Sequence, residues 1–220
     1  IDEVYGSVVY ITSTVNTTSG LSQGMGCGVI VDITTNGIDE ADVCYVFTCY
    51  HVVEDFLSLS VVVPDVPVVG EGADAYYDYG NIDYEKYVFT TEGENPTVSF
   101  VGGDAVTDVA VLKLDYSAYD DFTPVKAKVS NVENRPYRVG QTVFAIGNPS
   151  GNYPGTTSSG IISYVNRSLT IDDIGPIDVI QIDAPVDHGN SGGGLFNYYG
   201  ELKDLGEGAF TGCTSLKSIP

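Results

Sequence analysis

The strongest constraint on the fold is a succession of short runs of β-branched and aromatic residues, each closed by glycine, proline, asparagine or aspartate. Such runs predict strands, because these side chains suit a pleated surface and the punctuating residues favour turns. No stretch has the sustained 3.6-residue periodicity of an amphipathic helix. The chain is therefore expected to be all-β. The expected strands are Val4–Thr12, Met25–Ile33, Val43–Cys49, Leu57–Val63, Lys86–Thr90, Thr97–Val101, Val109–Leu114, Thr142–Ile146, Ser158–Val165, Ile177–Ile182 and Gly194–Tyr198.

The spacing of these strands predicts two antiparallel β-barrels joined by a polar connection. The first barrel is expected over residues 1–115, the linker over 116–136 and the second barrel over 137–200. A length of 220 residues and a hydrophobic fraction of 43% are enough for a packed core. The segment Pro64–Glu85 is rich in Asp, Tyr and Gly, and its carboxylates suit calcium without the order of an EF-hand. A solvated loop is the favoured interpretation of that segment.

The chain is strongly acidic, with 30 Asp and Glu residues against 9 Lys and Arg and a formal net charge of −21. Nucleic acid and anionic lipid surfaces would be repelled, so we expect no nucleic acid partner and no membrane insertion. No apolar run approaches the length of a membrane span. The two histidines, His51 and His188, and four cysteines without ligand spacing argue against a metal site.

Ser191 is the first candidate for catalysis, because it stands among glycines in the stretch Asp187–Gly194. Glycines permit a tight turn whose backbone N–H groups converge on an anion, although such a string alone is more often a plain turn. The chain also offers a base, His51, at the end of an expected strand, and an acid, Asp108, directly before another. Each is unremarkable alone, yet the order His51, Asp108, Ser191 is a known order of the Ser-His-Asp triad.

Several collinear blocks of the sequence follow one family pattern. The blocks are Gly26–Val31, the segment around His51, Thr107–Leu114, Val143–Pro149, Ser159–Ser163 and Asp183–Asn197. Through them the chain resembles the trypsin-like serine proteases of the bacterial HtrA/Deg type, which have the chymotrypsin fold. The resemblance implies two six-stranded antiparallel barrels and a serine endopeptidase acting on unfolded or exposed protein segments, without metal or cofactor.

The resemblance also assigns roles to the residues of the candidate site. Ser191 would attack the scissile carbonyl, His51 would take and return the proton, and Asp108 would orient His51. The oxyanion hole would lie in the turn of Gly189, Asn190 and Ser191, with the N–H groups of Gly189 and Ser191 as donors.

The expected substrate pocket has Pro185 and Val186 as its nearest residues and no carboxylate at its base, which favours a small apolar residue before the cleaved bond. By resemblance, the partners are protein or peptide substrates and further copies of the chain in a trimer. The same resemblance implies a bacterial protein that is secreted or held in the cell envelope.

Two features depart from the family pattern. Asp187 and His188 stand where the family has Asn-Pro, and a charge at Asp187 would oppose an oxyanion if it pointed inward. The second barrel is expected to be incomplete, because residues 201–220 form a tail in which 204–220 resemble one unit of bacterial leucine-rich repeats. An alternative hypothesis is therefore a non-catalytic, protease-like binding or adhesion protein whose repeats bind the partner.

The cysteines allow a test of strand register. If Met25–Ile33 and Val43–Cys49 form a hairpin closing near residue 38, positions whose numbers sum to 76 face each other, and Cys27 and Cys49 are such a pair. A disulfide between them and two buried free thiols are equally open alternatives.

Overall fold

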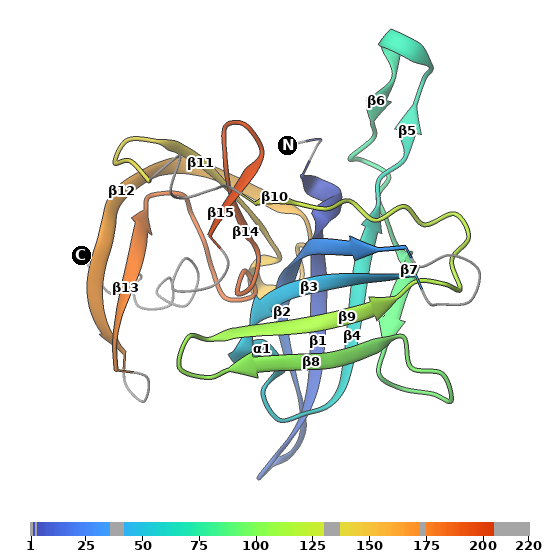
Figure 1. Cartoon of the computed structure of the whole chain (residues 1–220), viewed down its shortest axis with the longest axis horizontal. Coiled ribbons are helices and arrows are strands. Elements are labelled where there is room, and N and C mark those ends of the chain that lie inside the picture. Colours follow the sequence, from blue (N-terminus) through green and yellow to red (C-terminus); the bar gives the residue numbers. More distant parts are fainter. Residues whose placement is uncertain (1, 3, 36–41, 130–136, 172–174, 205–220) are drawn as a thin grey trace.

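In the computed structural model, nearly all regular structure is strand, as the sequence predicts (Figure 1). The structure describes residues 2, 4–35, 42–129, 137–171 and 175–204. The repeat-like unit, apart from Asp204, lies outside the described residues, as does Cys213. The strands are β1 (Val8–Thr17), β2 (Gly20–Thr34), β3 (Val43–Cys49), β4 (Phe56–Asp65), β5 (Val68–Val69), β6 (Tyr76–Tyr77), β7 (Asp83–Thr90), β8 (Val98–Asp104), β9 (Val109–Asp115), β10 (Lys128–Val129), β11 (Thr142–Gly147), β12 (Thr156–Ile171), β13 (Gly175–Ile182), β14 (Gly194–Asn197) and β15 (Glu201–Asp204). The helices are η1 (Tyr5–Ser7), α1 (Tyr50–Val53), η2 (Gly72–Asp74) and η3 (Pro149–Gly151).

The first half of the chain forms a seven-stranded antiparallel sheet in the order β7-β4-β1-β2-β3-β9-β8. Alternation of side chains fixes which face is buried, as in β9, where Ala110, Leu112 and Leu114 are fully buried and the residues between them are not. Their core includes Phe89 from β7 at the far edge, so the sheet curves around its own apolar face.

The second half forms a six-stranded sheet in the order β10-β15-β14-β11-β12-β13, packed around a core that includes Val143, Ile162 and Leu195. Both sheets are open in the described part of the chain, since β7 does not pair with β8, nor β10 with β13. The fold is thus all-β with an incomplete second barrel, as expected, whereas the first sheet has seven strands instead of six and is also open.

A third apolar cluster joins the two halves. It contains Val8 and Val29 from the first sheet and Ile146, Phe196 and Leu202 from the second. Figure 1 shows the sheets side by side at this junction. Burial of apolar surface contributes about 25 cal/mol per Å², so the shared cluster stabilises the contact between the halves as well as each half. No helix in the described residues is long and apolar enough to cross a membrane.

Each strand expected from the sequence is present, with ends that differ by a few residues. The predicted register of β2 against β3 is confirmed: Gly28 lies opposite Thr48, and the pairing holds to Ile30 before a bulge shifts it. Cys27 and Cys49 are buried free thiols, and no disulfide joins them.

The structure adds short strands that the sequence did not predict. The expected loop Pro64–Glu85 contains the hairpin β5–β6, which stands away from the two sheets (Figure 1). Strand β10 falls within the expected linker and pairs with β15, which falls within the expected tail. The second sheet continues through β15 to Asp204, beyond the domain boundary expected at residue 200.

Candidate active site

The pairing of β3 with β9 brings His51 and Asp108 together. The two strands run antiparallel with Cys49 opposite Val109, so the residues just beyond this pair meet at the same end of the sheet. The Tyr50 N–H donates to the Asp108 carbonyl oxygen at 3.0 Å. His51 donates its backbone N–H to Asp108 Oδ1 at 2.9 Å, and its ring Nδ1 lies 2.8 Å from Oδ2.

Asp108 is buried and its carboxylate is well satisfied. The residue is only 6% exposed, whereas 46% of the His51 side chain is accessible, so the acid is shielded and the imidazole faces solvent. Asp108 also has a backbone φ of +54°, an uncommon conformation that costs about 1–3 kcal/mol and tends to occur at functional sites. With Nδ1 bound to Asp108, the Nε2 of His51 is left for another partner.

Cys49 lies beside this pair and raises the question of a metal. The Cys49 sulfur, a His51 ring nitrogen and an Asp108 oxygen lie within 4.8 Å of one another. Burial, and then the negative charge of Asp108, raise the pKa of the Cys49 thiol. A metal would need the thiolate, so this grouping fits a protonated thiol beside a carboxylate–imidazole pair better than a metal site.

The loop before β14 holds Ser191 in a tight double turn. The Asn190 N–H donates to the Asp187 carbonyl at 3.1 Å, and the Gly193 N–H donates to the Asn190 carbonyl at 2.9 Å. Gly192 has a φ of +79°, and a Cβ there would lie 2.2 Å from the Cys27 carbonyl oxygen. Only glycine fits at that position, which explains one of the glycines that singled out this stretch.

Four successive carbonyl oxygens of this loop are each held by a hydrogen bond. His188 O accepts from the Ser150 N–H at 2.6 Å, Gly189 O from the Cys27 thiol at 3.2 Å, and Ser191 O from the Cys27 N–H at 2.7 Å. Asn190 O is the fourth, held by Gly193.

These bonds fix how the peptide planes of the loop are oriented. Carbonyl and N–H point in opposite directions across a trans peptide, so holding the carbonyls of 188 and 190 aims the N–H groups of Gly189 and Ser191 away from those bonds. Among the described residues, neither N–H makes a hydrogen bond. They are therefore available to an oxyanion, whereas the Asn190 N–H, the middle member of the predicted hole, is bound to Asp187.

The Asn190 side chain points into the protein instead of toward solvent. The residue is 6% exposed, and its Oδ1 has no hydrogen-bond partner among the described residues. It packs so closely on Gly147 that a Cβ there would lie 2.3 Å from this oxygen. The side chain therefore anchors the loop by packing against β11.

The Ser191 loop packs against β2, which in turn contacts α1, the short helix that carries His51. A Cβ placed on Gly26 would meet the side chain of Val52, the residue after His51, at 2.6 Å and the Ser191 carbonyl at 3.0 Å. Within the described residues, Ser191 Oγ and His51 Nε2 are not hydrogen-bonded to each other. Catalytic hydrogen bonds are often long until substrate tightens the site, so the arrangement is compatible with a triad.

The two residues that depart from the family pattern are partly accounted for. Asp187 Oδ1 accepts the His188 N–H at 2.6 Å, so its charge has a partner at the loop surface, and His188 is exposed. Of the predicted pocket residues, Pro185 is exposed and Val186 packs against the core of the second sheet.

Sequence reasoning missed the residues that hold the loop from behind. The sequence gives Cys27 a place in a matching block and in a possible disulfide, gives Asn148 a place in a matching block, and gives Ser150 no role. In the structure Cys27 contacts the loop through both its thiol and its N–H, and burial raises the thiol pKa, partly offset by the Asn148 N–H. The one available signal was the glycine on either side of Cys27, which lets other segments approach β2 closely.

Comparison with known proteins gives one family and several relatives. The trypsin-like peptidase domain model matches residues 26–203. The serine protease Do-like HtrA of Bacillus subtilis (strain 168) is 31% identical over 201 residues, which is 89% of this chain and 36% of that protein. The serine endoprotease DegS of Escherichia coli (strain K12) is 39% identical over 105 residues, 48% of this chain and 27% of that protein.

A third relative is named as a probable periplasmic serine endoprotease DegP-like protein of Rickettsia conorii, 37% identical over 123 residues, 56% of this chain and 23% of that protein. The chain thus spans between 23% and 36% of the length of these relatives. Among solved structures, the HtrA-type protease AlgW with tripeptide has a TM-score of 0.63 at 24% identity, covering 93% of this chain and 51% of that chain. At that identity the likeness concerns the fold alone.

Proposed function

This chain belongs to the trypsin-like peptidase family, and from that membership we propose that it is a serine endopeptidase using Ser191, His51 and Asp108. The observation that carries the proposal is the orientation of the loop peptides, which leaves the N–H groups of Gly189 and Ser191 unbonded beside the candidate nucleophile. A plain surface turn has no need of this arrangement, whereas acyl transfer requires it.

In the proposed mechanism, His51 Nε2 takes the proton of the Ser191 hydroxyl as the oxygen attacks the scissile carbonyl carbon. The proton then passes from His51 to the leaving amine, and water repeats the cycle on the acyl-enzyme. Asp108 acts through its 2.8 Å contact with Nδ1, which fixes the tautomer and stabilises the imidazolium. The burial of Asp108 makes this interaction stronger than it would be in water.

The developing oxyanion would accept hydrogen bonds from the N–H groups of Gly189 and Ser191. Removal of one such donor typically costs about 10²–10³ in rate. Because Ser150 and Gly193 hold the carbonyls of His188 and Asn190, whose peptides carry the two donors, the donors are oriented before substrate binds. Cys27 holds the neighbouring carbonyls of the same loop. Such preorganisation avoids reorganisation during the reaction, which is where electrostatic catalysis gains most.

For substrates we propose exposed segments of proteins, with a small apolar residue before the cleaved bond. Pro185 and Val186 would contribute one wall of that pocket, and no carboxylate stands among Ala184, Pro185 and Val186 to select a basic residue. We further propose an exported location and self-association. The periplasmic location named for the Rickettsia relative supports the first, and family resemblance supports the second.

A fluorophosphonate probe tests the proposal directly, since it reacts only with an activated serine. We expect the wild-type chain to be labelled, and Ser191→Ala to abolish labelling while the matched control Ser168→Ala, at an exposed strand position, leaves it unchanged. His51→Ala should lose labelling, whereas His188→Ala, which removes the other histidine, should retain it.

The contrary result is equally clear. A chain with the far-ultraviolet circular dichroism of a folded β-protein that is not labelled, and that does not hydrolyse an unfolded protein such as casein, would overturn the assignment. That outcome would favour the binding or adhesion alternative.

A further inference from the structure

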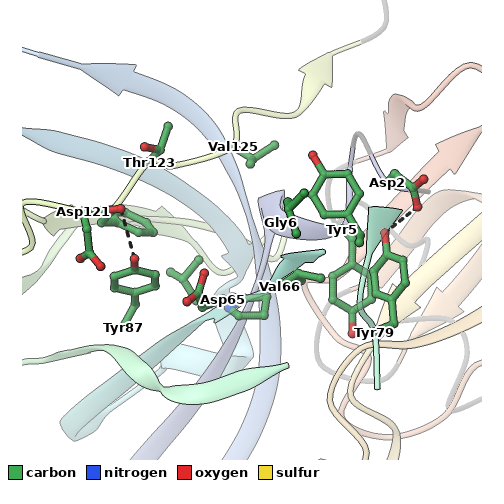
Figure 2. A pocket seen from close by; sticks show the side chains of 15 residues that line it. Asp2, Tyr5, Gly6, Asp65, Val66, Tyr79, Tyr87, Asp121, Thr123 and Val125 are labelled. Carbon is green, nitrogen blue, oxygen red and sulfur yellow. Dashed lines mark hydrogen bonds between the residues drawn. The ribbon is translucent and has the colours of Figure 1, made fainter. Parts of the chain in front are cut away.

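A cavity of about 340 Å³ lies between η1, the end of β4 and the segment around the β5–β6 hairpin. Figure 2 shows Tyr5 and Tyr79 with Asp2 at one end and Tyr87 with Asp121 at the other, with Gly6 and Val66 between them. None of its lining residues belongs to the candidate active site. The walls are Asp2, Tyr5, Gly6, Val63, Pro64, Asp65, Val66, Val68, Tyr77, Tyr79, Tyr87, Asp121, Phe122, Thr123 and Val125.

The walls combine aromatic rings with carboxylates. Five of the lining side chains are aromatic, three are aspartates, and no described lysine or arginine lines the cavity. An aromatic ring presents a negative face that attracts cations, and nearby carboxylates add to that attraction. A volume of this size is within the range of small-molecule sites.

The protein itself binds an ammonium group at one end of this cavity. Lys86 Nζ lies 2.7 Å from Asp65 Oδ2 and 3.1 Å from Asp121 Oδ2, and 4.7 Å from the centroid of the Tyr87 ring. Two carboxylates and a tyrosine face thus already hold an alkylammonium in the expected geometry. The lysine comes from β7 and lies outside the lining of the cavity.

The other end has the same chemistry but no cation from the described residues. The Tyr79 hydroxyl donates to Asp2 Oδ1 at 2.6 Å, and the Tyr5 and Tyr79 rings pack edge to face with centroids 5.0 Å apart. Desolvation, and then the adjacent carboxylate of Asp2, raise the pKa of Tyr79, so its hydroxyl keeps its proton and remains a donor. A second hollow of about 470 Å³ shares Asp2, Tyr5 and Tyr79 and continues toward Pro154.

We propose that this cavity binds an alkylammonium cation, with its apolar part against Tyr5 and Tyr79 and its charge beside Asp2. Charge complementarity selects this class: the chain has a net charge of −21, and the nearby segment 71–85 adds Glu71, Asp74, Asp78, Asp83 and Glu85 without a basic residue. An anionic or neutral ligand would bring no counter-charge to the Asp2 carboxylate, and no described lysine or arginine lines the cavity to supply one. The cation is either a free methylated amine or a lysine side chain of a bound polypeptide.

Paired probes that differ only in charge test the proposal on the full chain. Choline is compared with 3,3-dimethylbutan-1-ol, its neutral carbon isostere, by isothermal titration or ligand-observed NMR. We expect choline to bind at least about fivefold more tightly, and binding to weaken as salt is added. N-acetyl-lysine methylamide against its norleucine analogue distinguishes the two sources: the tighter of choline and the lysine derivative identifies the natural form.

Two variants locate the site. Asp2→Asn keeps the shape of the side chain but removes its charge, and Tyr79→Leu removes the ring; each should weaken choline binding by about three- to tenfold. Asp104→Asn and Tyr198→Leu are exposed controls of the same types and should leave binding unchanged. Equal affinity within both probe pairs, choline against its isostere and the lysine derivative against its norleucine analogue, overturns the proposal. Wild-type binding by both site variants overturns it as well. The measurements involve no hydrolysis, so they are independent of the proposed peptidase activity.

Discussion

The thiol of Cys27 donates a hydrogen bond of 3.2 Å to the carbonyl oxygen of Gly189, two residues before Ser191. The contact crosses from a strand of the first sheet to a loop of the second. Because burial raises the pKa of the thiol, the sulfur keeps its proton and remains a donor at any pH at which the protein is used. Cys27 is thus a positioning residue for the proposed oxyanion hole.

Replacement of Cys27 by Val is expected to lower kcat about tenfold with little change in KM, because the Gly189 peptide loses one of its constraints. Cys27→Ser, which restores a donor, should recover most of the rate. The same Val substitution at Cys44, which is buried but lies in the core of the first sheet, serves as control and should leave kcat unaltered. Steady-state kinetics on an unfolded protein substrate supply the measurement, and equal kcat values for the Val and Ser variants at position 27 would refute the role.

Asp108→Asn is expected to reduce kcat by about 10³–10⁴-fold while the chain stays folded, because the amide cannot stabilise the imidazolium or hold the same His51 tautomer. Asp104→Asn, at the exposed end of β8, changes the same residue type a few positions away and should have no effect on kcat. A rate within tenfold of wild type for Asp108→Asn would remove Asp108 from the mechanism.

Gly192→Ala should destabilise the fold by about 2–4 kcal/mol and abolish activity, since it combines a left-handed backbone with a clash against the Cys27 carbonyl. Gly140→Ala is the matched control: its φ is +83°, but nothing lies within 4 Å of the added Cβ. It should cost only the backbone strain, about 1 kcal/mol. Urea unfolding measures both, and equal losses would show that the contact with β2 is unimportant.

Alkaline pH should destabilise the protein partly through Cys44. Its thiol ionises near 9.0 when exposed, whereas burial raises the pKa to about 12 in the folded protein. Unfolding therefore releases a proton above pH 9, and the free energy of unfolding falls by about 1.4 kcal/mol per pH unit for this thiol as the pH rises from 9 toward 12. Below pH 9 the stabilisation is fully present.

Cys44→Val isolates that contribution, because other titrating groups cancel when the two proteins are compared. We expect the free energy of unfolding of the variant to be within about 1.5 kcal/mol of the wild-type value at pH 8. Between pH 9 and 11 it should rise steadily relative to the wild-type value. A difference in the free energy of unfolding, measured with urea, that does not change with pH would contradict the role given to the Cys44 thiol.

The sequence predicted the strands well where a run of residues alternates between buried and exposed faces. Strand β9 is an example, since its Ala110, Leu112 and Leu114 specify both the strand and its register. Strand β15 was missed because its sequence, Glu201 to Asp204, is mostly charged. The strand forms by pairing with β10 and β14. Hairpin β5–β6 was missed because its four strand residues are all exposed.

The candidate site could be predicted only as far as residue type and order reach. His51, Asp108 and Ser191 carry recognisable chemistry, and the structure brings His51 and Asp108 into contact. The contacts that orient the Ser191 loop use backbone groups and a thiol, and the pattern they leave in the sequence is limited to the glycines on either side of Cys27. The tyrosine-lined cavity could not be predicted either, because its walls come from segments far apart in the chain.

The main-chain hydrogen bond from Cys27 to Ser191 has a consequence for how the protein loses activity on unfolding. Two of the four held carbonyls of the loop are bonded to Cys27 in the first sheet, so slight separation of the halves would loosen the loop and move His51 away from it at the same time. The proposed peptidase activity therefore depends on contact between the halves, and we expect heating or denaturant to abolish it while each sheet still retains its strands.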